Sequence, residues 1–289
     1  MSRPLISILT PAYNAVTFLP DLIATVAAQD YDRFEHIVID DGSTDGTADL
    51  LAAAGSAHPH LRWYSRPNQG QYRTQNELIR RAKGDVLTFI CADDLYAGSR
   101  TLSLVAGQFE AFPDIEVVFG RTPRLVMARE GPYSFDPDLP GWMARFLMNH
   151  SPCIQHCSLF VRTSLVRRKS LYFDPWYKQR GDWDWLIRTF EATSRIRHIP
   201  QQLSYWRLHP GQTSQIESAA GRRETARLYA AHRIHPQVAG CARCVTFLHE
   251  QLVHLLSILR RRGLQELLRK FAGAVRRRIG AIPAGPLVS

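Results

Sequence analysis

The chain has 289 residues, 45% of them hydrophobic, which is enough for one large domain, or one domain with an appendage, around a sizeable core. Its formal net charge of +10 comes almost entirely from arginine, which favours anionic partners such as nucleotide diphosphates, anionic lipid or nucleic acid. The five sparse cysteines do not indicate a secreted disulfide framework. Without a recognisable signal peptide or bilayer-spanning run, the sequence predicts a cytoplasmic protein.

The first 120 residues alternate between two kinds of hydrophobic pattern. Short apolar runs predict strands at residues 5–9, 36–39, 61–64, 86–90 and 115–119. Apolar residues at three- and four-residue spacing predict helices at 18–26, 44–55, 71–83 and 101–112. This alternation predicts an α/β fold with a mostly parallel sheet and helices on both of its faces.

The alternation breaks after residue 120. Residues 121–214 are rich in proline and aromatic side chains, and we expect them to form a second half of the same domain that partly covers its cleft. Residues 215–289 have helical spacing and many arginines, which predicts a basic helical C-terminal extension.

Polar clusters follow three of the predicted strands, at Thr10–Asn14, Asp40-Asp41 and Asp93-Asp94. Ligands of parallel sheets bind beyond the carboxyl ends of the strands, so these clusters should meet in one cleft. Adjacent carboxylates such as Asp93 and Asp94 repel each other unless a cation or hydrogen-bond donors lie nearby. They are therefore either a solvated helix cap or ligands of Mg²⁺ or Mn²⁺, which complete their shell with substrate phosphates.

Several segments, in this order, resemble glycosyltransferase family 2, whose members have the Rossmann-like GT-A fold and bind a nucleotide sugar. The matching segments are Ser7–Asn14, Val38–Thr47, Asn68–Gln71 with Asn76, Ala82–Asp85, Cys91–Tyr96, Gly181–Arg188 and Tyr205–Pro210. The resemblance spans roughly residues 5–214 and points to bacterial polysaccharide or glycolipid synthesis. It implies an inverting transfer from a nucleotide-diphosphate sugar to an acceptor hydroxyl of a glycan or a lipid-linked acceptor.

The resemblance also implies roles for individual residues. The donor-binding residues would be Pro11, Ala12, Tyr13, Asn14, Asp41, Gly70, Arg73, Asn76 and Asp93. Asp94, together with Asp93, would bind the Mg²⁺ or Mn²⁺ ion. Asp182 would be the catalytic base, while Asp184, His156 and Trp183 would position the acceptor.

Two positions depart from the family pattern. Cys91 stands where the family often has the first aspartate of its metal motif, although Asp93 and Asp94 remain. Arg73 stands where related bacterial sequences often carry aspartate. It is either a phosphate partner or an exposed helix charge.

Several of these residues have a second, structural interpretation. Asp182 and Asp184 are also typical of the first turn of a helix, where the helix dipole favours carboxylates, and Trp183 can simply pack in the core. His209 is either an additional metal or diphosphate contact or a polar residue at a strand end. His156 is either close to the acceptor or a satisfied buried histidine.

The C-terminal extension carries two further patterns. Residues 247–279 combine leucines at helical spacing with clusters of arginine, which predicts either a helix on an anionic membrane surface or a helix packed on the domain. A peripheral position at the inner face of the plasma membrane would follow from the first alternative. Cys241 and Cys244 have zinc-like spacing but lack a second Cys-x-x-Cys pair.

Two other functions are compatible with the fold. A sugar nucleotidyltransferase would carry a glycine-rich basic loop after the first strand, which residues 10–17 lack. A non-catalytic nucleotide-sugar or polysaccharide-binding scaffold would not need Asp182 beside Asp93 and Asp94. The positive charge alone does not predict nucleic-acid binding, because no recognition motif accompanies it.

Overall fold

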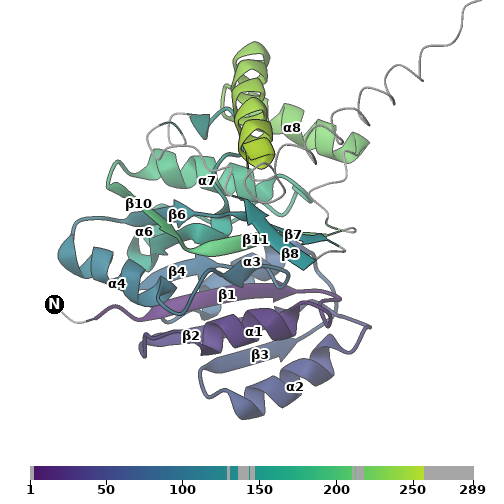
Figure 1. Ribbon diagram of the computed structural model, residues 1–289, viewed down its shortest axis with the longest axis vertical. Helices are drawn as coiled ribbons and strands as arrows, with labels where there is room; N and C mark the ends of the chain where they lie inside the picture. The colour runs from purple at the N-terminus through teal and green to yellow at the C-terminus, as the bar shows by residue number, and fades with distance from the viewer. Residues whose placement is uncertain are drawn as a thin grey trace, which may run out of the picture.

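A seven-stranded sheet forms the centre of the molecule in the computed structural model, which describes residues 3–128, 131–135, 143, 147–209, 212 and 218–256 (Figure 1). Its spatial order is β10 (Ile196–Gln202), β6 (Val117–Arg121), β9 (Leu159–Arg162), β4 (Val86–Phe89), β1 (Ile6–Ala12), β2 (Phe34–Asp40) and β3 (Leu61–Ser65). Neighbouring strands are parallel except at β9, which is antiparallel to both β4 and β6. The predicted mostly parallel sheet is therefore confirmed.

The continuous apolar runs of the strands are explained by burial on both faces of the sheet. Successive strand residues point to opposite faces, so Ile8 and Val38 pack in one core while Leu9 and Ile37 pack in the other. The first core is covered by α1 (Leu19–Ala27), α2 (Thr47–Ala57) and α4 (Thr101–Ala111). The second is covered by α3 (Gln71–Arg81), α6 (Thr163–Arg168) and α7 (Gly181–Ala192). Helices on both faces are thus confirmed.

One helix end was wrongly predicted. Gly55 was expected to end α2, but the helix continues to Ala57. The glycine instead allows close packing, because a Cβ at position 55 would lie 3.0 Å from the indole of Trp63 on the neighbouring strand β3. Tertiary packing, rather than helix termination, accounts for this residue.

Residues beyond 120 contribute to the same sheet and to a second one. Strand β9 inserts between β4 and β6, so the two parts of the chain share one sheet. The smaller sheet has the order β5 (Leu95–Tyr96), β11 (Ser204–Leu208), β7 (Arg124–Ala128) and β8 (Gly131–Phe135). Helix α8 (Ala219–Ala231) and a helix at 236–256, the yellow-green one in Figure 1, stand above α7. The rest of the predicted helical extension, residues 257–289, lies outside the described residues.

The strand order fixes the position of the cleft. Strand β1 pairs with β2 on one side and with β4 on the other, so the order in which successive strands are added to the sheet reverses at β1. Crevices form at such switch points, beyond the carboxyl ends of the strands. This brings Tyr13 after β1, Asp41 after β2 and Asp93 after β4 to one edge of the sheet.

Candidate active site

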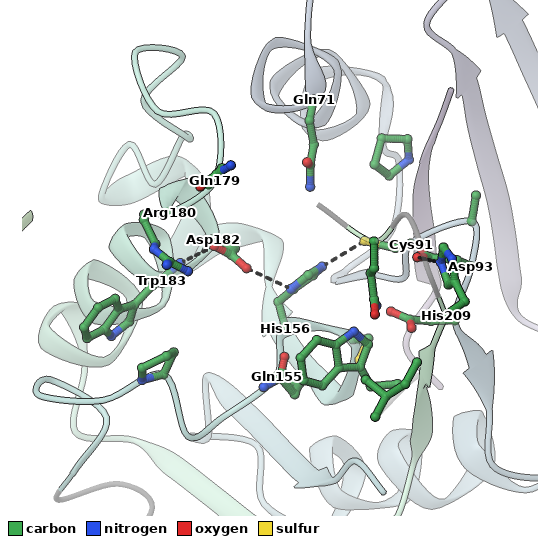
Figure 2. Close-up of a pocket in the computed structure, with 18 of the residues that line it drawn as sticks. Gln71, Cys91, Asp93, Gln155, His156, Gln179, Arg180, Asp182, Trp183 and His209 are labelled. Atoms are coloured by element: carbon green, nitrogen blue, oxygen red, sulfur yellow. Dashed lines mark hydrogen bonds and ion pairs between the residues drawn. The ribbon is translucent and has the colours of Figure 1, made fainter. Parts of the chain in front are cut away.

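A cleft of about 980 Å³ opens at this edge of the sheet. Most of the predicted site residues line it, namely Pro11, Ala12, Tyr13, Asn14, Asp41, Gly70, Asp93, Asp94, His156, Asp182, Trp183 and His209. Figure 2 shows Asp93 and His209 on one side of the cleft and Asp182 and Trp183 on the other, with His156 between them.

The turn after β1 is fastened to the turn after β2. Asn14 has a positive φ of 49°. Its backbone N–H donates to Ser43 Oγ at 2.8 Å, and its side-chain oxygen accepts from the Thr44 backbone N–H at 2.9 Å. Asn tolerates this left-handed conformation better than most residues. The turn leaves the Tyr13 ring 55% exposed at the cleft, available to a planar ligand.

Asp41 holds the next loop of this wall. Its carboxylate accepts from the N–H groups of Gln69 and Gly70, both at 2.9 Å, and pairs with Arg66. Gly70 has a φ of +91°, a conformation that L side chains rarely adopt. Asp41 therefore lines the cleft but also fixes the loop at 68–70, whose backbone forms part of the cleft wall.

Cys91, Asp93 and Asp94 cluster at the end of β4, with one ligand atom from each within 4.8 Å of the others. Burial, together with the Asp93 carboxylate, raises the pKa of Asp94 well above its usual range, although the Arg207 N–H donates to it at 3.2 Å. The His209 Nε2 lies 3.1 Å from the Asp93 carboxylate. A divalent cation would relieve the repulsion between these carboxylates, so the donors fit a Mg²⁺ or Mn²⁺ ion.

His156 bridges this cluster and Asp182 (Figure 2). Its Nε2 lies 3.4 Å from Cys91 Sγ, and its Nδ1 lies 3.9 Å from the Asp182 carboxylate. Burial lowers the pKa of His156, while the Asp182 carboxylate opposes that shift. The Nδ1 atom is buried and has no hydrogen-bond partner among the described residues. A neutral imidazole is thus held between the carboxylates of the two cleft walls.

The start of α7, which carries Asp182, is fixed from two sides. Glu224 of α8 accepts three backbone N–H groups, from Lys178 at 2.8 Å, Gln179 at 2.8 Å and Arg180 at 2.9 Å. The Gly181 N–H donates to the Tyr72 hydroxyl at 2.9 Å, and a Cβ at position 181 would lie 2.7 Å from that ring. The Asp182 side chain remains 35% exposed and lines the cleft.

Three predicted site residues do not line this cleft. The Asn76 amide is buried and bonds the backbone of Phe173 in both directions, at 2.8 and 2.7 Å. Asp184 accepts from Arg188 at 2.7 Å and contacts His232 Nε2 at 2.8 Å, so it joins α7 to the end of α8. Arg73 is exposed on α3 and faces a separate small recess. The side chains of Asn76 and Asp184 therefore bind other parts of the fold and do not face the cleft.

The cleft also includes residues that the sequence motifs did not indicate. The helix at 236–256 contributes Arg243, Thr246, Phe247 and Glu250, and the smaller sheet contributes Arg124 and Trp206. Arg180 also lines the cleft. It could have been proposed as a site residue from its position two residues before Asp182. The helix at 236–256 could not, because no spacing rule connects it with the motifs, which end at Pro210.

Two further features of the C-terminal extension can be compared with the structure, namely its cysteine pair and its apolar helical pattern. Cys241 and Cys244 are free and exposed, and within the described ranges only the cluster at Cys91 brings together enough donors for a metal. None of the described helices has the length and apolarity that a bilayer span requires.

The fold and site together define a GT-A type glycosyltransferase, in which carboxylates lie at the switch point of a Rossmann-like sheet. Residues 7–171 match the family described as Glycosyl transferase family 2. The chain is 31% identical over 204 residues to the PGL/p-HBAD biosynthesis glycosyltransferase of Mycobacterium tuberculosis, covering 69% of this chain and 76% of that protein. The chain belongs to glycosyltransferase family 2.

The chain is also similar to another relative in sequence and to two solved structures in fold. TuaG of Bacillus subtilis, named for teichuronic acid biosynthesis, is 30% identical over 130 residues, or 45% of this chain and 50% of that protein. The structure of S. aureus TarS 1–349 with UDP-GlcNAc gives a TM-score of 0.64 at 19% identity, covering 96% of this chain and 81% of that one. Mannosyltransferase PcManGT from Pyrobaculum calidifontis, in complex with GDP-Man and Mn²⁺, gives 0.65 at 17% identity, covering 95% and 81%. These two structures share the fold.

Proposed function

We propose that the protein is an inverting glycosyltransferase that moves a sugar from a nucleoside diphosphate donor to an acceptor hydroxyl. The observation that carries this proposal is that Asp182 and the Asp93–Asp94 pair line one cleft from opposite sides. The names of relatives, which refer to teichuronic acid and to the PGL/p-HBAD glycolipids, favour an acceptor of the cell envelope. We assign the activity to the cytoplasm, at the inner face of the plasma membrane.

The donor belongs on the wall formed by the ends of β1, β2 and β4. The exposed Tyr13 ring offers a surface for the base, beside the backbone of Gly70 and the carboxylate of Asp41. Asp93 and Asp94 would hold a divalent ion, with His209 steadying Asp93 through the 3.1 Å contact. When bound there, a Mg²⁺ or Mn²⁺ ion offsets the charge of the departing diphosphate.

Transfer is a single displacement in which the acceptor oxygen forms a bond to the anomeric carbon as the bond from that carbon to the diphosphate breaks. Asp182 accepts the proton of the acceptor hydroxyl, because its partly exposed carboxylate lines the opposite wall at the start of α7. His156 lies beside it, and its unused Nδ1 can donate to the carboxylate as that group moves to meet an acceptor. Trp183 packs behind the base, where its Nε1 donates to the Met148 carbonyl at 2.9 Å.

Substitution of the base tests this division of labour. Asp182→Asn keeps the size of the side chain but removes the proton acceptor, so single-turnover transfer should fall by about 10²–10⁴. Nucleoside diphosphate binding, measured by calorimetry with Mn²⁺, should remain within about twofold of wild type. Loss of donor binding would place the start of α7 in the nucleotide site, and wild-type transfer would exclude Asp182 as the base.

The donor nucleotide is identified by titration. Uridine, guanosine and thymidine diphosphates are compared with and without Mn²⁺, and one of them should bind in a metal-dependent manner. Absence of binding by all three would exclude uridine, guanosine and thymidine diphosphate sugars as donors and would contradict the nucleotide assignment made from this wall. Binding without transfer to any acceptor would favour the scaffold alternative.

A further inference from the structure

The helix at 236–256 has two opposite faces with different surroundings. On the inner face, Ala239 and Ala242 are buried at 0% and 4% exposure, and Thr246 contacts Ser151 at 3.1 Å. Arg243 and Glu250 of this face line the cleft. The helix is therefore packed on the catalytic body and forms part of its cleft wall.

The outer face is apolar and open to solvent. Its members recur at intervals of three, four and seven residues, as one face of a helix requires. They are Val238, Val245, Leu248, Leu252, Leu255 and Leu256, with exposures from 37% to 65%. We call these six residues the outer apolar face. Contiguous exposed apolar surface of this kind marks a binding surface more often than a chance arrangement.

The sequence that follows supplies the charge that would select the partner. Residues 257–289 carry eight basic side chains against one acidic, Glu266. The basic residues are Arg260, Arg261, Arg262, Arg269, Lys270, Arg276, Arg277 and Arg278. An apolar helical face that is followed in the sequence by so many arginines matches an anionic bilayer, where acyl chains accept the leucines and headgroups attract the cations.

We propose that the outer apolar face binds the surface of an anionic lipid bilayer. The helix would lie on the membrane with its six apolar side chains in the headgroup region, and its opposite face would remain on the cleft. This arrangement would hold the acceptor side of the cleft next to the lipid surface. The two alternatives from the sequence, a packed helix and a membrane helix, are then two faces of one element.

The proposal deepens the membrane location given in the proposed function by naming the surface that binds, and it is independent of the reaction, because the face can bind lipid whatever reaction the cleft performs. The full-length chain is sedimented with vesicles of phosphatidylcholine alone or mixed with phosphatidylglycerol, at low and high salt. We expect binding to the phosphatidylglycerol vesicles only, reduced by salt. Asp182→Asn should bind them like wild type, so failure of the catalytic assignment would leave this result unchanged.

A double substitution addresses the face itself. Leu248 and Leu252 are 65% and 54% exposed, so Leu248→Ser with Leu252→Ser should not disturb the fold. Partitioning to phosphatidylglycerol vesicles should fall about tenfold or more. Phe112→Ser is the matched control, since Phe112 is 41% exposed at the end of α4, away from this helix. Equal binding by wild type and the double variant would overturn the proposal, as would failure of wild type to sediment.

A second measurement does not depend on lost binding. Leu252→Trp keeps the position apolar, and its fluorescence should be quenched by brominated phospholipid in the vesicles, whereas that of Phe112→Trp should not change. Quenching equal to that of the control would overturn the proposal. The proposal would also be overturned if a second copy of the chain covered the face. In that case wild type would be a dimer in analytical ultracentrifugation, and Leu248→Ser with Leu252→Ser would convert it to monomer without affecting vesicle binding.

Discussion

The two walls of the cleft are built in different ways. The donor wall comes from the ends of three adjacent parallel strands, and neighbouring turns are tied together by direct hydrogen bonds such as that between Asn14 and Ser43. The acceptor wall combines the start of α7, the segment around His156 and the helix at 236–256, which are distant in sequence. It depends on single side chains that join one helix to another, above all Glu224 and Asp184.

This difference predicts how each wall responds to substitution. Apart from Asp41, which also fixes the loop at 68–70, residues of the donor wall are positioned by the sheet, so replacing one should remove its own ligand contact and little else. Residues that join the acceptor wall act through the groups they position. Their loss should lower transfer while donor binding persists, because a small displacement of a reacting group has a large effect on rate.

The largest effect within the donor wall is expected at the carboxylate cluster. Asp94→Ala removes a buried carboxylate from the proposed metal site, so metal-dependent nucleoside diphosphate affinity should fall about 100-fold or more. Calorimetry with and without Mn²⁺ measures this, and Asp32→Ala, at a 75% exposed side chain, is the control. An unchanged, still Mn²⁺-dependent affinity would remove Asp94 from the site.

Among the residues that join the elements of the acceptor wall, the largest effect is expected at Glu224. Its carboxylate accepts three N–H groups, and a glutamine there has only one acceptor oxygen and would oppose the others with its own N–H₂ group. Glu224→Gln should therefore lower single-turnover transfer about tenfold, with stability reduced by about 1–3 kcal/mol. Donor affinity should stay within about twofold of wild type.

A matched control separates this effect from a general loss of charge. Glu191→Gln changes an exposed glutamate near the end of α7 and should leave both transfer and unfolding by urea unchanged. If Glu224→Gln weakens donor binding as strongly as transfer, the two walls do not respond independently. The prediction that joining residues of the acceptor wall affect transfer alone would then be wrong.

The same difference explains what the sequence could predict. The strands and helices of residues 1–120 follow from local apolar periodicity, and the carboxyl ends of parallel strands necessarily share an edge, so the donor wall was predictable. Cys91 and His156 meet only because β9 inserts antiparallel beside β4, a pairing that local patterns do not encode. The anchoring of the 178–180 segment by Glu224 likewise depends on tertiary packing of α8.

The motif resemblance was least informative where a residue has a structural partner. Asn76 matches a family segment, yet both atoms of its amide bind the backbone of Phe173. Its sequence neighbour Tyr72 does reach the cleft, where its hydroxyl accepts from Gly181. The two residues lie on the same side of α3 one turn apart, so the position along the helix, rather than the motif, decides which of them reaches the cleft.

The smallest effect on transfer is expected at Asp184, which lies two residues after the proposed base but points to other partners. The carboxylate contacts His232 and Arg188, so Asp184→Asn should weaken the joint between α7 and α8 while leaving Asp182 at the cleft. We expect transfer to fall less than about threefold and stability at pH 7 to fall by about 1–3 kcal/mol.

The pH dependence of that stability loss identifies its cause. Burial would raise the pKa of Asp184, but the hydrogen bond with His232 and the charge of Arg188 outweigh it and lower the pKa below its ordinary 3.8. A lowered pKa means that the ionised group stabilises the fold above pH 3.8 and that this contribution disappears as the pH falls through the lower, folded-state value. The stability difference between wild type and Asp184→Asn should therefore be constant near neutrality and shrink on acidification, as measured by urea unfolding. A difference that grows in acid would show that the Asp184 charge is not what joins the two helices. A loss of transfer as large as that of Asp182→Asn would assign Asp184 to the reaction itself.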